Sequence, residues 1–190
     1  MPAQLSLRIV LPASPAPPEE FAARELSKYL AAMGNGEPQI VRAPAEGDIY
    51  LGAFPPGIPH SDRRHIESAL AGRGPDSFVL RSTPAGLVMH GNSPRAHLYA
   101  AYHYLESLGV RWYFPGQEGE VIPHAAAKLA SYDTTQIPSF RERGIVIFPT
   151  DTVWGIGCRI DKPESIKKLY ELRKRPKIQA APVLVSSIEQ

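Results

Sequence analysis

Proline and glycine divide the first three quarters of this chain into short segments, and each segment has the periodicity of a strand or a helix. The chain has 190 residues, including 20 prolines and 15 glycines. Apolar side chains occupy every second position of residues 5–11, which predicts a half-buried strand. Pro17 then begins a helix whose first turn carries acidic residues, next to the positive helix end, and whose apolar face extends to Met33.

The same signals continue to about residue 143. They predict strands at 39–42, 48–51, 77–81 and 86–90, the last two joined by a turn at 83–86. They predict helices at 62–71, with Ser61 as cap and Gly72 as stop, and at 94–108, with Asn92 or Ser93 as cap and Gly109 as stop. We therefore expect an α+β domain at 1–143, with a mixed or antiparallel sheet and helices packed on one face.

Composition and charge exclude few functional classes of protein. Basic and acidic residues number 21 and 19, so the net charge is +2, which gives no strong signal for nucleic acid or an anionic membrane. Residues 1–10 alternate and carry charge, so we expect neither a signal peptide nor a membrane-spanning segment there. Cys158 is the single cysteine, and its apolar, glycine-flanked setting favours a small buried residue over a nucleophile.

The histidines of the first region do not have the spacing of a metal site. His90, His97 and His103 include no pair at i, i+4, the spacing that places two imidazoles on one helix face. A polar surface position or a hydrogen-bonded core position is the favoured interpretation for each. We predict no metal site.

Two further groups in the first region allow a functional and a structural interpretation. The aromatic run 112–114 has the character of a sugar-stacking platform, but an aromatic run after an amphipathic helix is more typical of a core. Glu118 and Glu120 are two nearby carboxylates in a polar loop, where solvated side chains are the rule. We predict core packing for the first group and assign no catalytic pair to the second.

Residues 91–102 (GNSPRAHLYAAY) and 105–116 (LESLGVRWYFPG) resemble the N-terminal accessory domain of α-glucuronidases and hexosaminidase-like glycoside hydrolases. The resemblance extends over about 5–143, and residues 138–144 (PSFRERG) resemble the stretch that leads into the catalytic barrel. It implies that the catalytic carboxylates belong to the barrel, not to this domain. The implied partners are a carbohydrate or that barrel.

The last quarter of the chain changes character. Residues 145–148 (IVIF) form a continuous apolar strand, which is typical of burial on both faces, and a Pro-Thr-Asp-Thr turn follows. Asp161 and Glu164 suit a capping box for a helix with Pro163 in its first turn. The basic run 173–177 suits the negative end of that helix.

Residues 149–158 (PTDTVWGIGC), 173–176 (RKRP) and 182–185 (PVLV) resemble the beginning of the Sua5/YrdC family, the threonylcarbamoyl-adenylate synthases of tRNA modification. The resemblance places Thr150, Thr152 and Trp154 at a threonine and nucleotide pocket, and Arg173 and Arg175 at the phosphates. Hydroxyl groups suit a small amino acid, and guanidinium groups suit phosphate oxygens. ATP and Mg²⁺ are the implied ligands.

This segment departs from the family pattern in several places. Arg173 replaces a lysine, Trp154 replaces a tyrosine, and 179–181 (QAA) replaces a Lys-Pro-Leu stretch. The family's later Ser-x-Asn motif does not occur before Gln190. We therefore expect a truncated fragment at 144–190 that does not catalyse, and no cofactor for the chain as it stands.

Three functional hypotheses follow from these patterns. The first is a non-catalytic accessory domain joined to an incomplete Sua5/YrdC-like segment. The second is a threonylcarbamoyl-adenylate synthase, and the third is an inactive junction of two gene fragments. The Sua5/YrdC resemblance implies the cytoplasm, a glycoside hydrolase parent is compatible with export, and the sequence alone identifies no location.

Overall fold

The computed structural model describes residues 7–113, 116–125, 131–138, 145–149, 154–158 and 163–174. It divides into two compact units, Met1–Pro138 and Ser139–Gln190, and each is described by itself. The predicted boundary between 143 and 144 lies outside the described residues. None of the helices in the described ranges is both long and apolar enough to cross a membrane.

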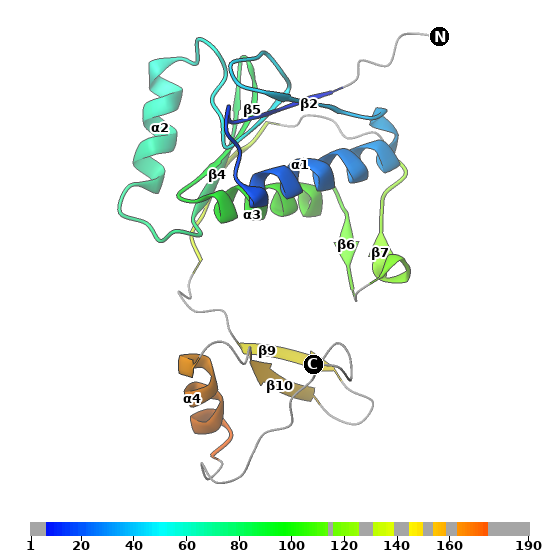
Figure 1. Ribbon diagram of the computed structural model, residues 1–190, viewed down its shortest axis with the longest axis vertical. Coiled ribbons are helices and arrows are strands. Elements are labelled where there is room, and N and C mark those ends of the chain that lie inside the picture. Colours follow the sequence, from blue (N-terminus) through cyan, green and yellow to red (C-terminus); the bar gives the residue numbers. More distant parts are fainter. Residues whose placement is uncertain are drawn as a thin grey trace. The chain divides into compact units, whose positions relative to one another are not determined.

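A six-stranded mixed sheet forms the centre of the first unit (Figure 1). Its order is β2 (Gln39–Arg42), β1 (Arg8–Leu11), β3 (Ile49–Leu51), β5 (Gly86–Gly91), β4 (Phe78–Thr83) and β8 (Asp133–Gln136). The first four strands are parallel, and the β4 pairings with β5 and β8 are antiparallel. The predicted α+β class with a mixed sheet is confirmed.

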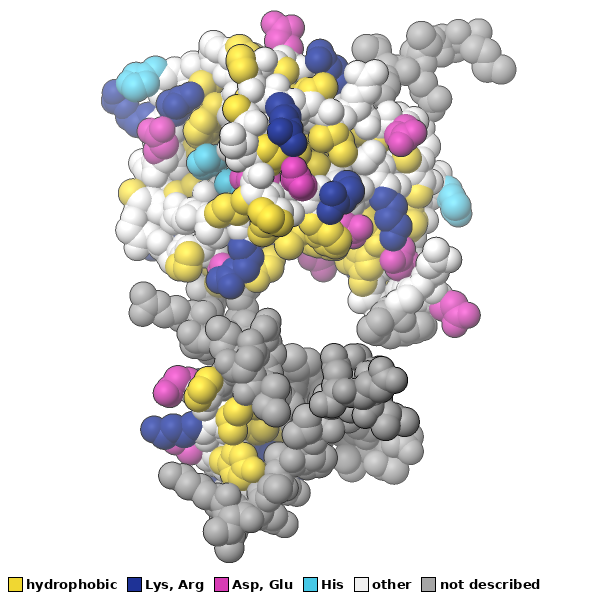
Figure 2. Space-filling model, in the orientation of Figure 1, with side chains coloured by type: hydrophobic (Ala, Val, Ile, Leu, Met, Phe, Trp, Pro, Cys, Tyr) yellow, Lys and Arg dark blue, Asp and Glu magenta, His cyan; other side chains and the backbone are white. Residues whose placement is uncertain are grey.

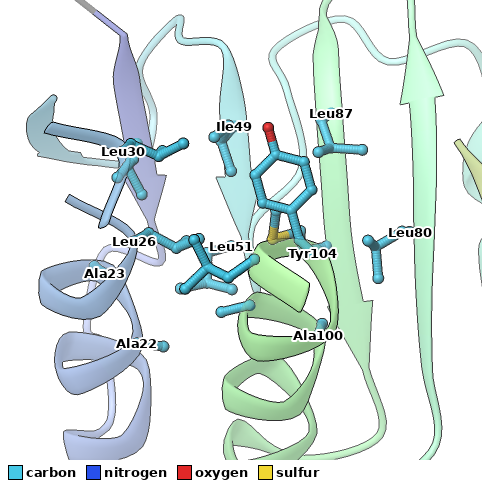
Figure 3. Packing of buried hydrophobic residues seen from close by; sticks show 14 of the residues in the cluster. Ala22, Ala23, Leu26, Leu30, Ile49, Leu51, Leu80, Leu87, Ala100 and Tyr104 are labelled. Carbon is cyan, nitrogen blue, oxygen red and sulfur yellow. The ribbon is translucent and has the colours of Figure 1, made fainter. Parts of the chain in front are cut away.

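Helices α1 (Pro17–Leu30) and α3 (Pro94–Ser107) lie side by side against one face of this sheet (Figure 1). Figure 3 shows Leu26 and Leu30 of α1 and Tyr104 of α3 directed toward the strands. These three side chains are at most 1% exposed, and burying one leucine stabilises a fold by about 1.5–3 kcal/mol. The cluster also includes Ile9, Leu11, Ile49, Leu51, Leu80, Leu87 and Met89 from the strands.

Helix α2 (His60–Leu70) adds a layer that the sequence did not predict. Its Ile66 and Leu70 pack with Val10, Tyr50, Val79 and Val88 in a second buried cluster. These strand residues alternate with those of the first cluster, so they point to the opposite face of the sheet. The sheet is therefore covered on both faces, not only on the predicted one.

Of the caps predicted for α2 and α3, the structure confirms one and contradicts the other. Ser93 caps α3, because its hydroxyl accepts the Ala96 N–H at 3.1 Å. The prediction that Ser61 caps α2 is wrong, because α2 begins at His60 and Pro59 is its N-cap. The Pro59 carbonyl accepts the N–H groups of Asp62 and Arg63 at 3.0 and 3.1 Å. The helix therefore starts two residues earlier than predicted, at His60 and not at Asp62.

The first unit also contains two smaller elements. A π-helical turn, Ala31–Asn35, follows α1 and ends the helix at Gly34, which has φ +99°. After α3, strand β6 (Arg111–Trp112) pairs antiparallel with β7 (Glu120–Val121), and a short 3₁₀ turn, Gln117–Gly119, lies between them. This short hairpin carries the aromatic and acidic residues considered below.

The described part of the second unit is a hairpin and a helix. Strand β9 (Ile145–Pro149) pairs antiparallel with β10 (Trp154–Cys158), and α4 (Pro163–Leu172) follows. Leu169 is buried, Ile166 and Tyr170 are half-buried and Lys167 is exposed, so the helix has one apolar face that is at least half-buried. Asp161 of the predicted capping box lies outside the described residues.

Candidate functional site

The motif that carries the glycoside hydrolase resemblance lies where β5 ends and α3 begins. A Cβ on Gly91 would lie 2.6 Å from Cβ of Ala96 and 2.9 Å from the Ser77 carbonyl oxygen. Real Cβ atoms do not approach that closely, so only glycine fits here. Gly91 thus lets the strand pack directly on the first turn of α3.

Asn92 joins the end of α2 to the start of α3. Its side-chain amide donates to the carbonyls of Leu70, Arg73 and Gly74 at 2.9, 3.1 and 3.3 Å. The last carbonyls of a helix have no partner within the helix, so the contact with Leu70 supports the end of α2, and the contacts with Arg73 and Gly74 hold the turn that follows it. Asn92 was predicted as a possible cap for α3, but its side chain contacts the end of α2 instead.

Arg95 fastens the first turn of α3 to the loop before β4. Its Nε and Nη2 lie 2.8 and 2.6 Å from Oδ1 of Asp76, which is buried. Charge-assisted contacts of this kind are stronger than neutral hydrogen bonds. Asn92 and Arg95 therefore join α3 to other elements of the fold, while Ser93 caps α3 itself.

Glu19 and His97 form a buried pair between α1 and α3. Nδ1 of His97 donates to Oε1 of Glu19 at 2.7 Å, and Oε2 of Glu19 accepts the Ala16 N–H at 2.6 Å. The two residues are 4% and 6% exposed. Gly52 has φ +72°, and a Cβ there would lie 2.7 Å from both Oε1 of Glu19 and Nδ1 of His97. Glycine at this position leaves room for the pair.

Burial governs the protonation of His97. It lowers the pKa of His97 below the ordinary value, although the Glu19 carboxylate and the Gly91 carbonyl favour the protonated ring. Nε2 of His97 is buried and has no partner that meets hydrogen-bond geometry. The interpretation of His97 as a hydrogen-bonded core histidine is confirmed for Nδ1, and Nε2 is the exception.

His90, at the end of β5, lies against His97. Their ring centres are 5.3 Å apart, and the ring of Phe54 lies 4.6 Å from His90 on another side. Burial, together with the nearby His97 and Arg63, lowers the pKa of His90 to about 4. Nδ1 of His90 is buried without a hydrogen-bond partner. His90 is thus a half-buried residue with an unsatisfied ring nitrogen.

His103 is the third candidate histidine, and its ring centre lies 5.5 Å from that of Phe78. Within the described ranges, no three or more His, Cys, Asp or Glu side chains are grouped so that they would hold a metal ion. The absence of a metal site remains a prediction.

The aromatic run at 112–114 divides between core and surface. Trp112 donates from Nε1 to the Tyr29 hydroxyl at 2.7 Å and contacts the rings of Tyr29 and Tyr102 edge-on. The core prediction is therefore confirmed for Trp112 and wrong for Tyr113, which is 72% exposed. Tyr113 follows β6, which ends at Trp112, and it does not belong to the buried cluster that Trp112 packs against. Phe114 lies outside the described residues.

The carboxylates at 118 and 120 also differ from each other. Glu118 is exposed, as predicted. Both carboxylate oxygens of Glu120 lie 3.2 Å from Nζ of Lys28, so the prediction that Glu120 is simply solvated is wrong. A hydrogen bond with Tyr29 raises the pKa of Lys28, and the Glu120 carboxylate raises it further. Glu120 thereby joins the β6–β7 hairpin to α1.

Charged side chains of both signs are interspersed over the face of the first unit that Figure 2 shows. Among the described ion pairs of this unit, Arg42 and Glu20 lie 3.4 Å apart, and Lys28 and Glu120 lie 3.2 Å apart. A mixed surface of this kind does not attract a polyanion over a long range.

The predicted Sua5/YrdC-type residues fall mostly at the margins of the described ranges. Trp154 is the first residue of β10 and pairs with Pro149, the last residue of β9. Thr150, Thr152 and Arg175 lie outside the described residues. Arg173 is exposed directly after α4, and its N–H donates to the Leu169 carbonyl at 3.0 Å. The predicted assembly of these residues into one pocket stays a prediction.

One feature of this region was not apparent from the sequence. Lys174 has φ +49°, a left-handed conformation shortly after the end of α4 at Leu172. Glycine or asparagine is the usual signal for such a helix end, and neither is present here. The described part of the basic run, Arg173 and Lys174, therefore lies directly after the helix.

Comparison with solved structures identifies a similar chain for the first region. It is a family GH115 4-O-methyl-α-glucuronidase with specificity for decorated arabinogalactans. The similarity covers 70% of this chain and 18% of that one, with 18% identity and a TM-score of 0.49.

Comparison with protein families and curated proteins concerns the end of the chain. Residues 139–190 match the model of the Sua5/YciO/YrdC family, whose description reads "Telomere recombination". The threonylcarbamoyl-AMP synthase of Saccharophagus degradans is 33% identical over 57 residues, which cover 30% of each chain. That of Vibrio campbellii is 41% identical over 46 residues, 24% of this chain and 25% of the relative.

A third relative, the threonylcarbamoyl-AMP synthase of Bacillus subtilis, is 38% identical over 50 residues, 26% of this chain and 14% of the relative. The chain thus spans about a third or less of the length of these relatives. Together, the family model and the three synthases show that residues 139–190 of this chain are similar to the Sua5/YrdC family.

Proposed function

We propose that the first unit is a non-catalytic accessory domain of a carbohydrate-active enzyme, as its sequence resemblance implies. The observation that carries this proposal is the use of the 91–95 motif. Gly91 permits close packing, Asn92 holds the end of α2, and Ser93 caps α3. Arg95 binds the buried Asp76. The part of the domain with the most specific sequence is thus used to build the fold.

The carboxylates of this unit support the same proposal. Glycosidases generally use two carboxyl groups on either side of the scissile bond, about 5–9.5 Å apart according to mechanism. Glu19 is committed to His97 and to the start of α1, and Asp76 is committed to Arg95. Glu120 is paired with Lys28. Each of these groups has a structural task that a catalytic role would disrupt.

A hydrolysis assay tests the accessory role. The full chain is incubated with aryl glycosides and with glucuronic-acid-substituted oligosaccharides, and we expect no release of product above the buffer rate. Release that Glu118→Gln or Glu120→Gln abolishes would contradict the proposal. Glu67→Gln, at an exposed position on α2, is the matched control, because it removes a carboxylate far from the hairpin in sequence.

A second candidate function is favoured by the names of the relatives of residues 139–190. In this candidate, Thr150, Thr152 and Trp154 contact threonine and nucleotide. Arg173 and Arg175 contact the phosphate oxygens, and Mg²⁺ neutralises the phosphate charge. The exposure of Arg173 after α4 supports its availability to an anion. Because the chain spans about a third or less of these relatives, we propose that it does not form the adenylate itself.

Calorimetric titration separates the two candidates. Threonine is titrated into the full chain in the presence of ATP and Mg²⁺, and we expect no saturable heat at millimolar threonine. Saturable binding that Thr152→Ala or Arg175→Ala abolishes would instead assign a functional ligand site to residues 139–190. Lys167→Ala is the control, since it removes an exposed positive charge from α4 without altering the predicted pocket residues.

A further inference from the structure

One group of polar side chains in the first unit has no role in the binding or catalysis considered above. The buried Glu19 and His97 and the half-buried His90 form a cluster at the ends of β3 and β5, where α1 and α3 begin. We propose that this cluster is a pH-sensitive contact that holds α1 and α3 on the sheet while both imidazoles are neutral and weakens when acid protonates them.

The geometry limits the cluster to one compensated positive charge. Glu19 is the only carboxylate that the described contacts place against His97, and its second oxygen already accepts the Ala16 N–H. The rings of His90 and His97 are 5.3 Å apart, so two protonated rings would repel each other at close range. Burial makes this repulsion stronger than it would be in water.

The groups that face His90 from neighbouring elements add to the repulsion. Helix α3 contributes His97, and α2 contributes Arg63, whose guanidinium carbon lies 4.4 Å from the centre of the Phe54 ring. That ring in turn stacks on His90 at 4.6 Å. Helix α1 contributes only Glu19, which is bound to His97. His90 therefore has cations, and no carboxylate of its own, among the described groups that act on it.

The direction of the pH effect follows from the two states of the chain. Burial lowers the pKa of His90 from 6.5 to about 4 in the folded unit, and it lowers the pKa of His97 as well. An unfolded chain has ordinary histidines, so it binds more protons than the folded chain between those values. Stability is therefore full above about pH 7 and falls as the pH decreases toward about 4.

Urea unfolding of the full chain at several pH values between 7.5 and 4.5 tests the proposal. We expect the unfolding equilibrium constant of the first unit to rise with acid, with His90 contributing about 70-fold between pH 7.5 and 4.5. His90→Gln should remove most of that contribution. His103→Gln, which replaces a histidine on the same helix as His97, should leave it unchanged. Equal pH dependence in the two variants would overturn the proposal.

A direct titration keeps the proposal testable if His90→Gln does not fold. Ring-proton resonances of the wild-type chain are followed by NMR from pH 8 to the onset of acid unfolding. We expect the signals of His90 and His97 to titrate below the ordinary range of histidine. An ordinary or raised pKa for both His90 and His97 would overturn the proposal.

Discussion

The two units of this protein differ in how much of their structure rests on buried contacts. The first has a six-stranded sheet with helices on both faces and two buried clusters. In the second, the described elements are a two-stranded hairpin and one helix, in which Ser165 and Leu169 are buried. An isolated hairpin is only marginally stable in water. A segment with a specific family match therefore does not have to be the segment that stabilises the chain.

The largest expected effect comes from the core of the first unit. Leu26→Ala removes a fully buried side chain between α1 and the sheet and should cost about 2–5 kcal/mol of unfolding free energy. Each unit has one tryptophan, so the loss is measured by Trp112 fluorescence in urea with Trp154→Phe as background. With Trp112→Phe as background, Trp154 should report an unchanged midpoint. An equal shift of both signals would remove the distinction between the units.

The next largest effect concerns the link between α2 and α3. Asn92→Ala leaves the carbonyls of Leu70, Arg73 and Gly74 without their side-chain donor, which should cost about 1–3 kcal/mol. Gln117→Ala, at an exposed site in the same unit, should cost far less. Equal stabilities of the two variants in chemical denaturation would contradict the structural role given to Asn92.

A pair of serines tests the helix starts. Ser93→Ala removes the N-cap hydroxyl of α3 and should cost about 1 kcal/mol, whereas Ser61→Ala should have almost no effect, since Ser61 lies inside α2. Thermal unfolding followed by circular dichroism measures both. A larger loss for Ser61→Ala would restore the original prediction of the cap.

The smallest effect is expected at the surface. Arg42 and Glu20 form a pair at 3.4 Å with side chains 62% and 42% exposed. Such pairs contribute about 0–1 kcal/mol, so Arg42→Ala should change the unfolding free energy little. Arg95→Ala removes a charged partner of the buried Asp76 and should cost clearly more. Similar costs of the two substitutions in urea unfolding would show that burial of the carboxylate does not determine the strength of an ion pair here.

Local signals in the sequence predicted most elements of the fold, because they act within a few residues. Gly109 has φ +100° directly after α3, and Pro94 is its first residue, as expected. The helices were predicted to cover one face of the sheet, and the position of α2 on the other face was not predicted. Periodicity identifies Ile66 and Leu70 as apolar, but it does not say which side of a sheet they cover.

The contacts of the polar cluster could not be predicted for a similar reason. Glu19 and His97 are 78 residues apart, and no local rule pairs them. Glu19 had a local interpretation as a first-turn acid, which is true but incomplete. Tyr113 was misassigned because the aromatic run was treated as one group, whereas Trp112 packs against the first buried cluster and Tyr113, directly after β6, is exposed.

Native-state hydrogen exchange of the full chain tests most directly the claim that the first unit stabilises itself. Exchange is followed by mass spectrometry at increasing urea concentrations below the unfolding midpoint. We predict that amides of α1, α3 and the central strands open together with a high free energy, while those of β9, β10 and α4 open separately with a lower one. One shared opening, with equal protection in the two sets of elements, would contradict the account.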